Sequence, residues 1–214
     1  MLLKQLKIGS LDNFTYLIAN PLQRIGTVID LGWGGEAADR LLEEAAADGI
    51  DIKYVVATHF HADHINGIGY LLEKTGAELL VHEDEEGSMC RLGYRPDIVV
   101  KHNDLLSLGG LTVRFFHTPG HSPGSLCLYS EDKLFTGDTL FVGGCGRADL
   151  PRSDPEALYH SLFNKILSLP EETLIYPGHD YGDAPFSSLK KELADNPYLR
   201  CKTLEEFLQL RMGR

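Results

Sequence analysis

Residues Thr58-His59-Phe60-His61-Ala62-Asp63-His64 place three imidazoles and one carboxylate within six consecutive positions. The apolar run 50–57 directly before them predicts a buried strand. Neutral imidazole nitrogens and carboxylate oxygens are ligands of zinc, and also of iron and manganese. The stretch therefore predicts a metal-binding loop at the end of a strand, in preference to a surface loop that happens to be rich in histidine.

Further metal-capable residues follow the ends of later predicted strands. His121 lies in a turn rich in proline and glycine, Asp138 follows Gly137, and His179 follows Pro177-Gly178. Loops at one edge of a sheet scaffold can bring ligands from distant positions together. With residues 59–64 they supply five imidazoles and two carboxylates, which exceeds the needs of one tetrahedral ion. We expect two divalent ions, zinc first with iron or manganese as alternatives, and Asp138 as the bridge between them.

The rest of the chain predicts short strands followed by helices. Strands are expected at 6–8, 15–19, 27–30, 50–57, 78–82, 98–101, 105–107, 111–116, 125–129, 133–136 and 173–176, and helices at about 36–48, 63–74, 155–168, 185–194 and 203–212. The acidic, glycine-containing segment 83–96 is expected to be an irregular lid or insertion. No linker divides the sequence, so we expect one domain over 1–214 with short C-terminal helices from about 185 to 214.

Composition limits the classes of partner. A hydrophobic content of 43% over 214 residues suits a sizeable core. The net charge of -11 repels phosphate backbones and anionic membrane surfaces, so neither nucleic acid nor a membrane is an expected partner. The four cysteines form no CxxC pair, and no signal-peptide core or apolar run of about 18 residues is present. We therefore expect a cytoplasmic protein with reduced thiols, either a monomer or a homodimer.

The motif HxHxDH at 59–64, followed by Gly120-His121, Gly137-Asp138-Thr139 and Gly178-His179, resembles the metallo-β-lactamase superfamily over nearly the whole chain. The resemblance implies an α/β (α+β) fold, the four-layer αββα sandwich, with the site at one edge of its two sheets. It also implies two ligand sets: His59, His61 and His121 for the first metal and Asp63, His64 and His179 for the second, with Asp138 shared.

Within the superfamily, residues 118–121, 137–141, 144–147 and 178–181 are similar to glyoxalase II-like hydrolases, which cleave the thioester S-D-lactoylglutathione. The resemblance implies a small-molecule thioester or ester substrate, with glutathione-derived compounds among the candidates. Arg147 and Tyr181 are the expected substrate-binding residues, and Asp30 and His117 are expected to support the ligand histidines.

The expected mechanism uses two cations to acidify a shared water, so that a metal-bridging hydroxide attacks the substrate carbonyl. Asp138 and Asp63 are the catalytic residues in this interpretation, because Asp138 joins the ions and Asp63 both binds the second ion and orients the nucleophile. A thiolate leaving group needs little protonation, so a separate general acid is not required.

Two alternatives stay open. Residues 61–65, 144–149 and the tail with Asn196-Pro197 and 205–207 also resemble persulfide dioxygenases, which hold one iron through the equivalents of His59, His121 and Asp138. The alternative from another class is a non-catalytic metal-binding scaffold. The complete ligand set favours an enzyme over that scaffold.

Overall fold

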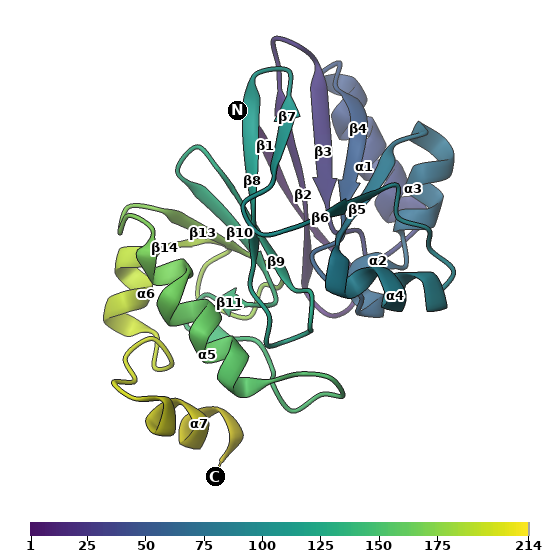
Figure 1. Cartoon of the computed structure of the whole chain (residues 1–214). Coiled ribbons are helices and arrows are strands. Elements are labelled where there is room, and N and C mark those ends of the chain that lie inside the picture. Colours follow the sequence, from purple (N-terminus) through teal and green to yellow (C-terminus); the bar gives the residue numbers. More distant parts are fainter. Residues whose placement is uncertain (214) are drawn as a thin grey trace.

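Two six-stranded sheets pack face to face in the computed structural model, which describes residues 1–213 (Figure 1). Arg214, the last residue of the expected domain, lies outside the described residues. The first sheet has the order β1 (Leu2–Ile8), β2 (Asn13–Asn20), β3 (Ile25–Ile29), β4 (Asp51–Val56), β5 (Glu78–His82) and β6 (Ile98–Val100). The second has the order β14 (Ser187–Ser188), β13 (Leu174–Pro177), β10 (Lys133–Gly137), β9 (Leu126–Ser130), β8 (Leu111–His117) and β7 (Leu105–Leu108). A small ribbon pairs β11 (Leu140–Phe141) with β12 (Gly144–Cys145).

Helices cover the outer faces of both sheets (Figure 1). The first sheet carries α1 (Glu36–Ala47), α2 (Ala62–Ile65), α3 (Ile68–Thr75) and α4 (Glu83–Arg91), and the second carries α5 (Pro155–Asn164), the 3-10 turn η1 (Ile166–Ser168), α6 (Leu189–Asp195) and α7 (Leu204–Met212). Three buried clusters separate the layers: Leu41 belongs to the first helix–sheet cluster, Phe135 to the cluster between the sheets, and Phe207 to the second helix–sheet cluster. The predicted four-layer αββα sandwich is confirmed.

Parallel pairing brings the ends of distant strands to one edge. β3 and β4 run parallel, so Asp30 and the loop 57–64 leave the first sheet at the same edge. In the second sheet β10 pairs in parallel with β13, and Gly137 lies opposite Pro177 in the register. Asp138 and His179, which follow these strands closely, therefore emerge side by side.

The helix expected at 63–74 is two short helices, and a close backbone contact explains the break. A Cβ atom on Gly67, between α2 and α3, would lie 2.3 Å from the carbonyl oxygen of Trp33. Only glycine lets the chain pass Trp33 at this distance. The break leaves Asp63 and His64 on their own single helical turn, beside the predicted ligands of the neighbouring loop.

Segment 83–96 begins with a regular helix, so the expectation of an irregular insertion is wrong for its first nine residues, those of α4. Its first turn carries four acidic residues, which are favourable at the positive end of the helix dipole. His82 precedes the helix, and its Nδ1 accepts a hydrogen bond from the backbone N–H of Asp84 at 3.2 Å. The acidic residues and Gly87, read as loop signals, are compatible with a helix of this length.

Smaller differences occur near the C-terminus. The helix expected from 185 begins at Leu189, because residues 187–188 first pair with β13 as β14. The two-residue strands β11, β12 and β14 were not predicted. Within residues 1–213, no helix combines the length and the apolar character needed to cross a membrane.

Phe207 offers a test of whether the C-terminal helices unfold together with the rest of the chain. It is fully buried, with ring centroids 5.5 Å from Tyr159 and 6.1 Å from Tyr198. We expect Phe207→Ala to lower the free energy of unfolding by about 3–5 kcal/mol, because it removes a packed ring and leaves a cavity. Denaturant unfolding followed by the fluorescence of Trp33, the single tryptophan, measures this from the other half of the chain.

Leu210→Ala in the same helix is the matched control, since Leu210 is 47% exposed, and should change the free energy by about 1 kcal/mol or less. The expectation of a single domain would be contradicted if Phe207→Ala shifts the denaturant unfolding transition seen by far-ultraviolet circular dichroism but leaves the transition seen by Trp33 fluorescence unchanged.

Candidate metal centre

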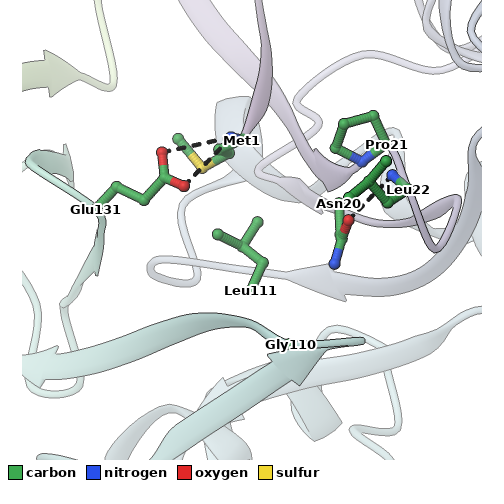
Figure 2. A pocket seen from close by; sticks show the side chains of 7 residues that line it. All are labelled: Met1, Asn20, Pro21, Leu22, Gly110, Leu111 and Glu131. Atoms are coloured by element: carbon green, nitrogen blue, oxygen red, sulfur yellow. Dashed lines mark hydrogen bonds and ion pairs between the residues drawn. The ribbon is translucent and has the colours of Figure 1, made fainter.

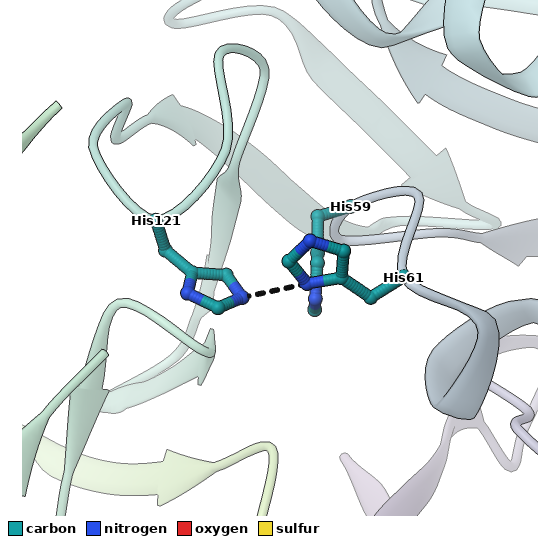
Figure 3. A group of neighbouring side chains, drawn as sticks. All are labelled: His59, His61 and His121. Carbon is teal, nitrogen blue, oxygen red and sulfur yellow. Dashed lines mark hydrogen bonds between the residues drawn. The ribbon is translucent and has the colours of Figure 1, made fainter. Parts of the chain in front are cut away.

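His59, His61 and His121 form a tight group at the sheet edge, with their rings turned toward one another (Figure 3). His61 Nδ1 lies 2.8 Å from His121 Nε2. His59 Nε2 is buried and, within residues 1–213, has no hydrogen-bond partner. Two nitrogens bound to one tetrahedral ion at about 2.0–2.1 Å would lie about 3.3 Å apart. The group therefore has the donor type, the convergence and the unsatisfied atom that suit a metal ion.

A second group consists of Asp63, His64 and His179. His64 Nε2 and His179 Nε2 lie 3.1 Å apart. Asp63 Oδ2 is 3.6 Å from the former nitrogen and 3.4 Å from the latter. Asn13 Nδ2 donates to the same oxygen at 3.0 Å, which fixes the orientation of the carboxylate. Two imidazoles and one carboxylate again converge on one point.

Asp138 lies between the two groups. Its Oδ2 is 3.5 Å from His121 Nε2 and 3.4 Å from His179 Nε2, and its Oδ1 is 3.3 Å from His64 Nε2. This carboxylate therefore contacts imidazoles of both groups, as a bridging ligand must. A Cβ atom on Gly178 would lie 2.5 Å from Asp138 Oδ1, so glycine at 178 is what lets the two parallel loops approach.

Hydrogen bonds from Nδ1 to Asp30 or to a backbone carbonyl orient three of the imidazoles. His64 Nδ1 donates to Asp30 Oδ2 at 2.8 Å, His121 Nδ1 to the carbonyl of Arg147 at 3.0 Å, and His179 Nδ1 to the carbonyl of Leu11 at 2.8 Å. Each bond places the proton on Nδ1 and leaves a lone pair on Nε2, which faces the centre.

Asp30 has the wider set of contacts. It is 3% exposed, and its carboxylate also accepts from the backbone N–H and the hydroxyl of Thr58, both at 2.7 Å. Thr58 Oγ1 in turn lies 3.0 Å from His59 Nδ1. Asp30 thus holds the start of the histidine loop as well as His64.

The electrostatics of the site favour neutral ligands in the first group and a carboxylate anion beside the second. Burial holds the pKa of His59 well below its ordinary value, and burial followed by His121 lowers the pKa of His61 to about 4. Burial also opposes a charge on His64, but Asp138 and Asp30 outweigh it and raise its pKa. Burial would raise the pKa of Asp138, yet His64 and His179 hold it well below its usual range. Divalent ions would replace the protons that these groups share.

Of the two expected substrate-binding residues, Arg147 contacts the ligand group through its backbone and Tyr181 through its ring. The Arg147 guanidinium makes two 2.9 Å contacts with Asp149, and only the backbone carbonyl of Arg147 reaches a candidate ligand, His121. The Tyr181 ring stacks on His179 with centroids 4.5 Å apart and planes at 12°, and it is 57% exposed. Tyr181 therefore forms a wall of the site that a substrate can touch.

His117 was expected to support His121, but it hydrogen-bonds elsewhere. Its Nε2 donates to the carbonyl of Pro123 at 2.8 Å, and its ring stacks on His82 with centroids 3.7 Å apart. The carbonyl of Arg147 fills the supporting position at His121 instead. Asn13 and the carbonyls of Leu11 and Arg147 were missed because an amide and two carbonyls carry no motif.

Two other features lie apart from the centre. His82, Asp84 and His117 have ligand-type atoms within 4.8 Å of one another. The two histidine rings stack in parallel, however, and one nitrogen of each is already hydrogen-bonded, that of His82 to the backbone N–H of Asp84 and that of His117 to the carbonyl of Pro123. A hollow of about 280 Å³ (Figure 2) lies at the opposite ends of the strands, where the terminal amine of Met1 contacts Glu131 at 3.3 Å. Neither feature adds a ligand to the site.

Known proteins resemble this chain in sequence and in fold. The metallo-beta-lactamase superfamily matches residues 9–179. A hydroxyacylglutathione hydrolase of Pelagibacter ubique is 33% identical over 202 residues, covering 92% of this chain and 80% of that protein. The mitochondrial persulfide dioxygenase ETHE1 of Homo sapiens is 34% identical over 214 residues, covering 98% and 80%. The crystal structure of ETHE1 from Myxococcus xanthus is similar with a TM-score of 0.90 and 34% identity, covering 100% of this chain and 91% of that one.

The names of these relatives give two reactions, a hydrolysis and an oxygenation, among proteins similar to this chain. The superfamily match runs from the end of β1 to His179, the last candidate ligand. The chain therefore belongs to the metallo-beta-lactamase superfamily of metal-dependent enzymes.

Proposed function

We propose that this protein is a dinuclear metal-dependent hydrolase of a thioester or ester, similar to glyoxalase II. The observation that carries the proposal is the position of Asp138, within 3.5 Å of imidazole nitrogens from both ligand groups. A single ion held by His59, His121 and Asp138 would leave His61, Asp63, His64 and His179 without an ion to bind. Two ions use all seven side chains.

Zinc, or iron or manganese in its place, would lower the pKa of a water molecule toward ~7 and polarise a carbonyl oxygen. The chain's own residues orient the reactants. Asn13 donates to Asp63 Oδ2, the oxygen that faces His64 and His179, and so holds the carboxylate where it can orient the attacking water and take up its proton. The water oxygen bonds to the carbonyl carbon, the carbon–sulfur bond breaks, and the thiolate leaves without needing a general acid.

Exposed apolar side chains beside the ligands suit an organic substrate. Leu11 is 50% exposed, Trp33 37% and Tyr181 57%. Burial, followed by Asp138 and Asp63, raises the pKa of Tyr181 to about 12, so the phenol stays protonated and can donate a hydrogen bond to a bound acyl group.

A persulfide dioxygenase is the second candidate. The TM-score of 0.90 with the Myxococcus xanthus ETHE1, over the whole of this chain, favours it. It would need one iron and would leave the second ligand group vacant, which makes the metal count the decisive measurement.

We expect two metal ions per chain by elemental analysis and release of thiol from S-D-lactoylglutathione by the loaded protein. Oxygen uptake with glutathione persulfide, measured on the same preparation, should stay at background. One iron per chain with oxygen uptake and no thiol release would replace the hydrolase with the dioxygenase.

Asp138→Ala should remove the contact between the two groups. We expect the metal content to fall below two ions per chain and kcat/KM for the thioester to drop by about a hundredfold or more. Asp132→Ala is the control, because Asp132 is exposed at the start of β10 rather than its end. Unchanged metal content and turnover in Asp138→Ala would exclude the proposed centre.

Asp30→Asn should weaken one ion selectively. The carboxylate of Asp30 accepts hydrogen bonds from Thr58 and from His64 Nδ1, whereas an amide has only one accepting oxygen. The asparagine therefore cannot keep all of these bonds, and His64 loses its orientation. We expect the affinity for the ion held by His64 to fall by about 10–100-fold in chelator competition, and the affinity for the ion held by His59, which contacts Asp30 only through Thr58, to fall less. Two unchanged affinities would show that Asp30 supports only the fold.

A further inference from the structure

Helix α4 and the loop before α5 line an open hollow of about 260 Å³ next to the metal centre. Its lining residues are Phe60, Ser88, Arg91, Leu92 and Arg152. Figure 1 shows the loop before α5 extending toward α4. Phe60 stands between the ligands His59 and His61 in the sequence, and its ring centroid lies 4.8 Å from that of His61. The hollow and the centre therefore share a wall.

Two guanidinium groups converge on one hydroxyl in this hollow. Arg91 Nη2 donates to Ser88 Oγ at 3.2 Å, and Arg152 Nη1 donates to the same oxygen. Ser88 is 4% exposed. A hydroxyl oxygen accepts two hydrogen bonds, so both of its lone pairs are used and its own O–H remains available as a donor. No acceptor for this O–H occurs among residues 1–213.

Neither arginine forms an ion pair within 4.0 Å in the part of the chain that the structure describes. Arg147, by contrast, is paired with Asp149. Arg152 acts on the buried Glu85 carboxylate, but Glu85 Oε1 accepts from Ser122 Oγ and Gly124 N–H and forms no ion pair with Arg152. Two unpaired arginines around one oxygen, in a chain of net charge -11, form a local donor site for an anion.

The backbone supports the same interpretation. Arg152 has φ +71°, a left-handed conformation that a residue with a long side chain rarely adopts. Conformations of this kind persist where the surrounding structure requires them, and they cluster at binding sites. Here the conformation accompanies the turn that directs Arg152 to Ser88. Its guanidinium carbon also lies 5.7 Å from the centre of the Phe60 ring.

We propose that this hollow binds an anionic group of the substrate, a carboxylate or a phosphate, while the reacting carbonyl lies at the metal centre. The inference rests on the hydrolase function proposed above. Arginine forks and a hydroxyl donor match the oxygens of such anions. Phe60 and Leu92 supply apolar walls for the part of the substrate that joins the anion to the carbonyl. The segment 83–96 is then a substrate-recognition element.

Three thioesters that differ at one end test this subsite. They are S-acetyl-2-mercaptoethanol, which is neutral, S-acetyl-3-mercaptopropionate, which carries a carboxylate, and S-acetyl-2-mercaptoethyl phosphate. Thiol release by the zinc-loaded protein should give a higher kcat/KM for one or both anions than for the neutral ester. In the Arg91→Gln/Arg152→Gln variant this preference should fall about tenfold or more, through KM, with the neutral ester unaffected.

Arg40→Gln is the matched control, because Arg40 is exposed in α1 and its loss changes the net charge in the same direction. If Arg40→Gln reduces the preference for the anionic esters as much, per charge removed, as the double variant does, the preference comes from the overall electric field of the protein. That result would overturn the subsite. An unchanged preference in the double variant would overturn it as well. The carboxylate and phosphate esters show which anion the hollow prefers.

If the protein releases no thiol from any of the three esters, the proposed hydrolase function is contradicted. The anion subsite can then be tested by binding alone. Calorimetric titration with 3-(methylthio)propionate and 2-(methylthio)ethyl phosphate should show a Kd about tenfold higher in the double variant than in the wild type. Equal Kd values would exclude the anion site independently of catalysis.

Discussion

A buried carboxylate among five imidazoles constrains this whole structure. Taking the charge of Asp138 out of water is costly unless opposite charges and donors surround it closely. His64, His121 and His179 lie within 3.5 Å of its oxygens, and each comes from a different loop. The two sheets must therefore present their edges together, and Gly178 must lack a side chain for the loops to meet. Once assembled, the cluster has more ligand atoms than it can satisfy by itself, and metal ions would complete it.

The sequence brings out the candidate ligands because each has a local signal. Residues 59–64 form a dense histidine motif after a strand, and His121, Asp138 and His179 each follow a glycine. The paired sheets were expected from the family resemblance that these motifs carry, and not from the order of strands and helices. Where the prediction fails, the determining contact is distant in the sequence: the break at Gly67 depends on Trp33, and the place expected for His117 is taken by the carbonyl of Arg147. A carbonyl oxygen carries no residue-type signal at all.

Helix α4 shows the same limit in another way. Its composition resembles a loop, and the role we propose for its residues depends on its position near the loop before α5. Ser88 and Arg152 are 64 positions apart, and their contact exists because the loop before α5 crosses to the first sheet's side of the molecule. Neither residue belongs to a motif. Residues that choose a substrate in this fold lie on such connections, where sequence can vary without disturbing the sheets.

This separation explains how one superfamily supports different reactions. The ligand residues belong to strand ends that the fold fixes, so a hydrolase and a dioxygenase can retain the same side chains. The number of ions then depends on whether the second group is held ready, and here Asp30 and Asn13 orient His64 and Asp63 toward it. Asp30 also accepts from the backbone N–H and the hydroxyl of Thr58, next to His59, so its burial supports both ligand groups. The orientation that Asn13 and Asp30 give to the second group is the reason for which we propose two ions, and with them hydrolysis.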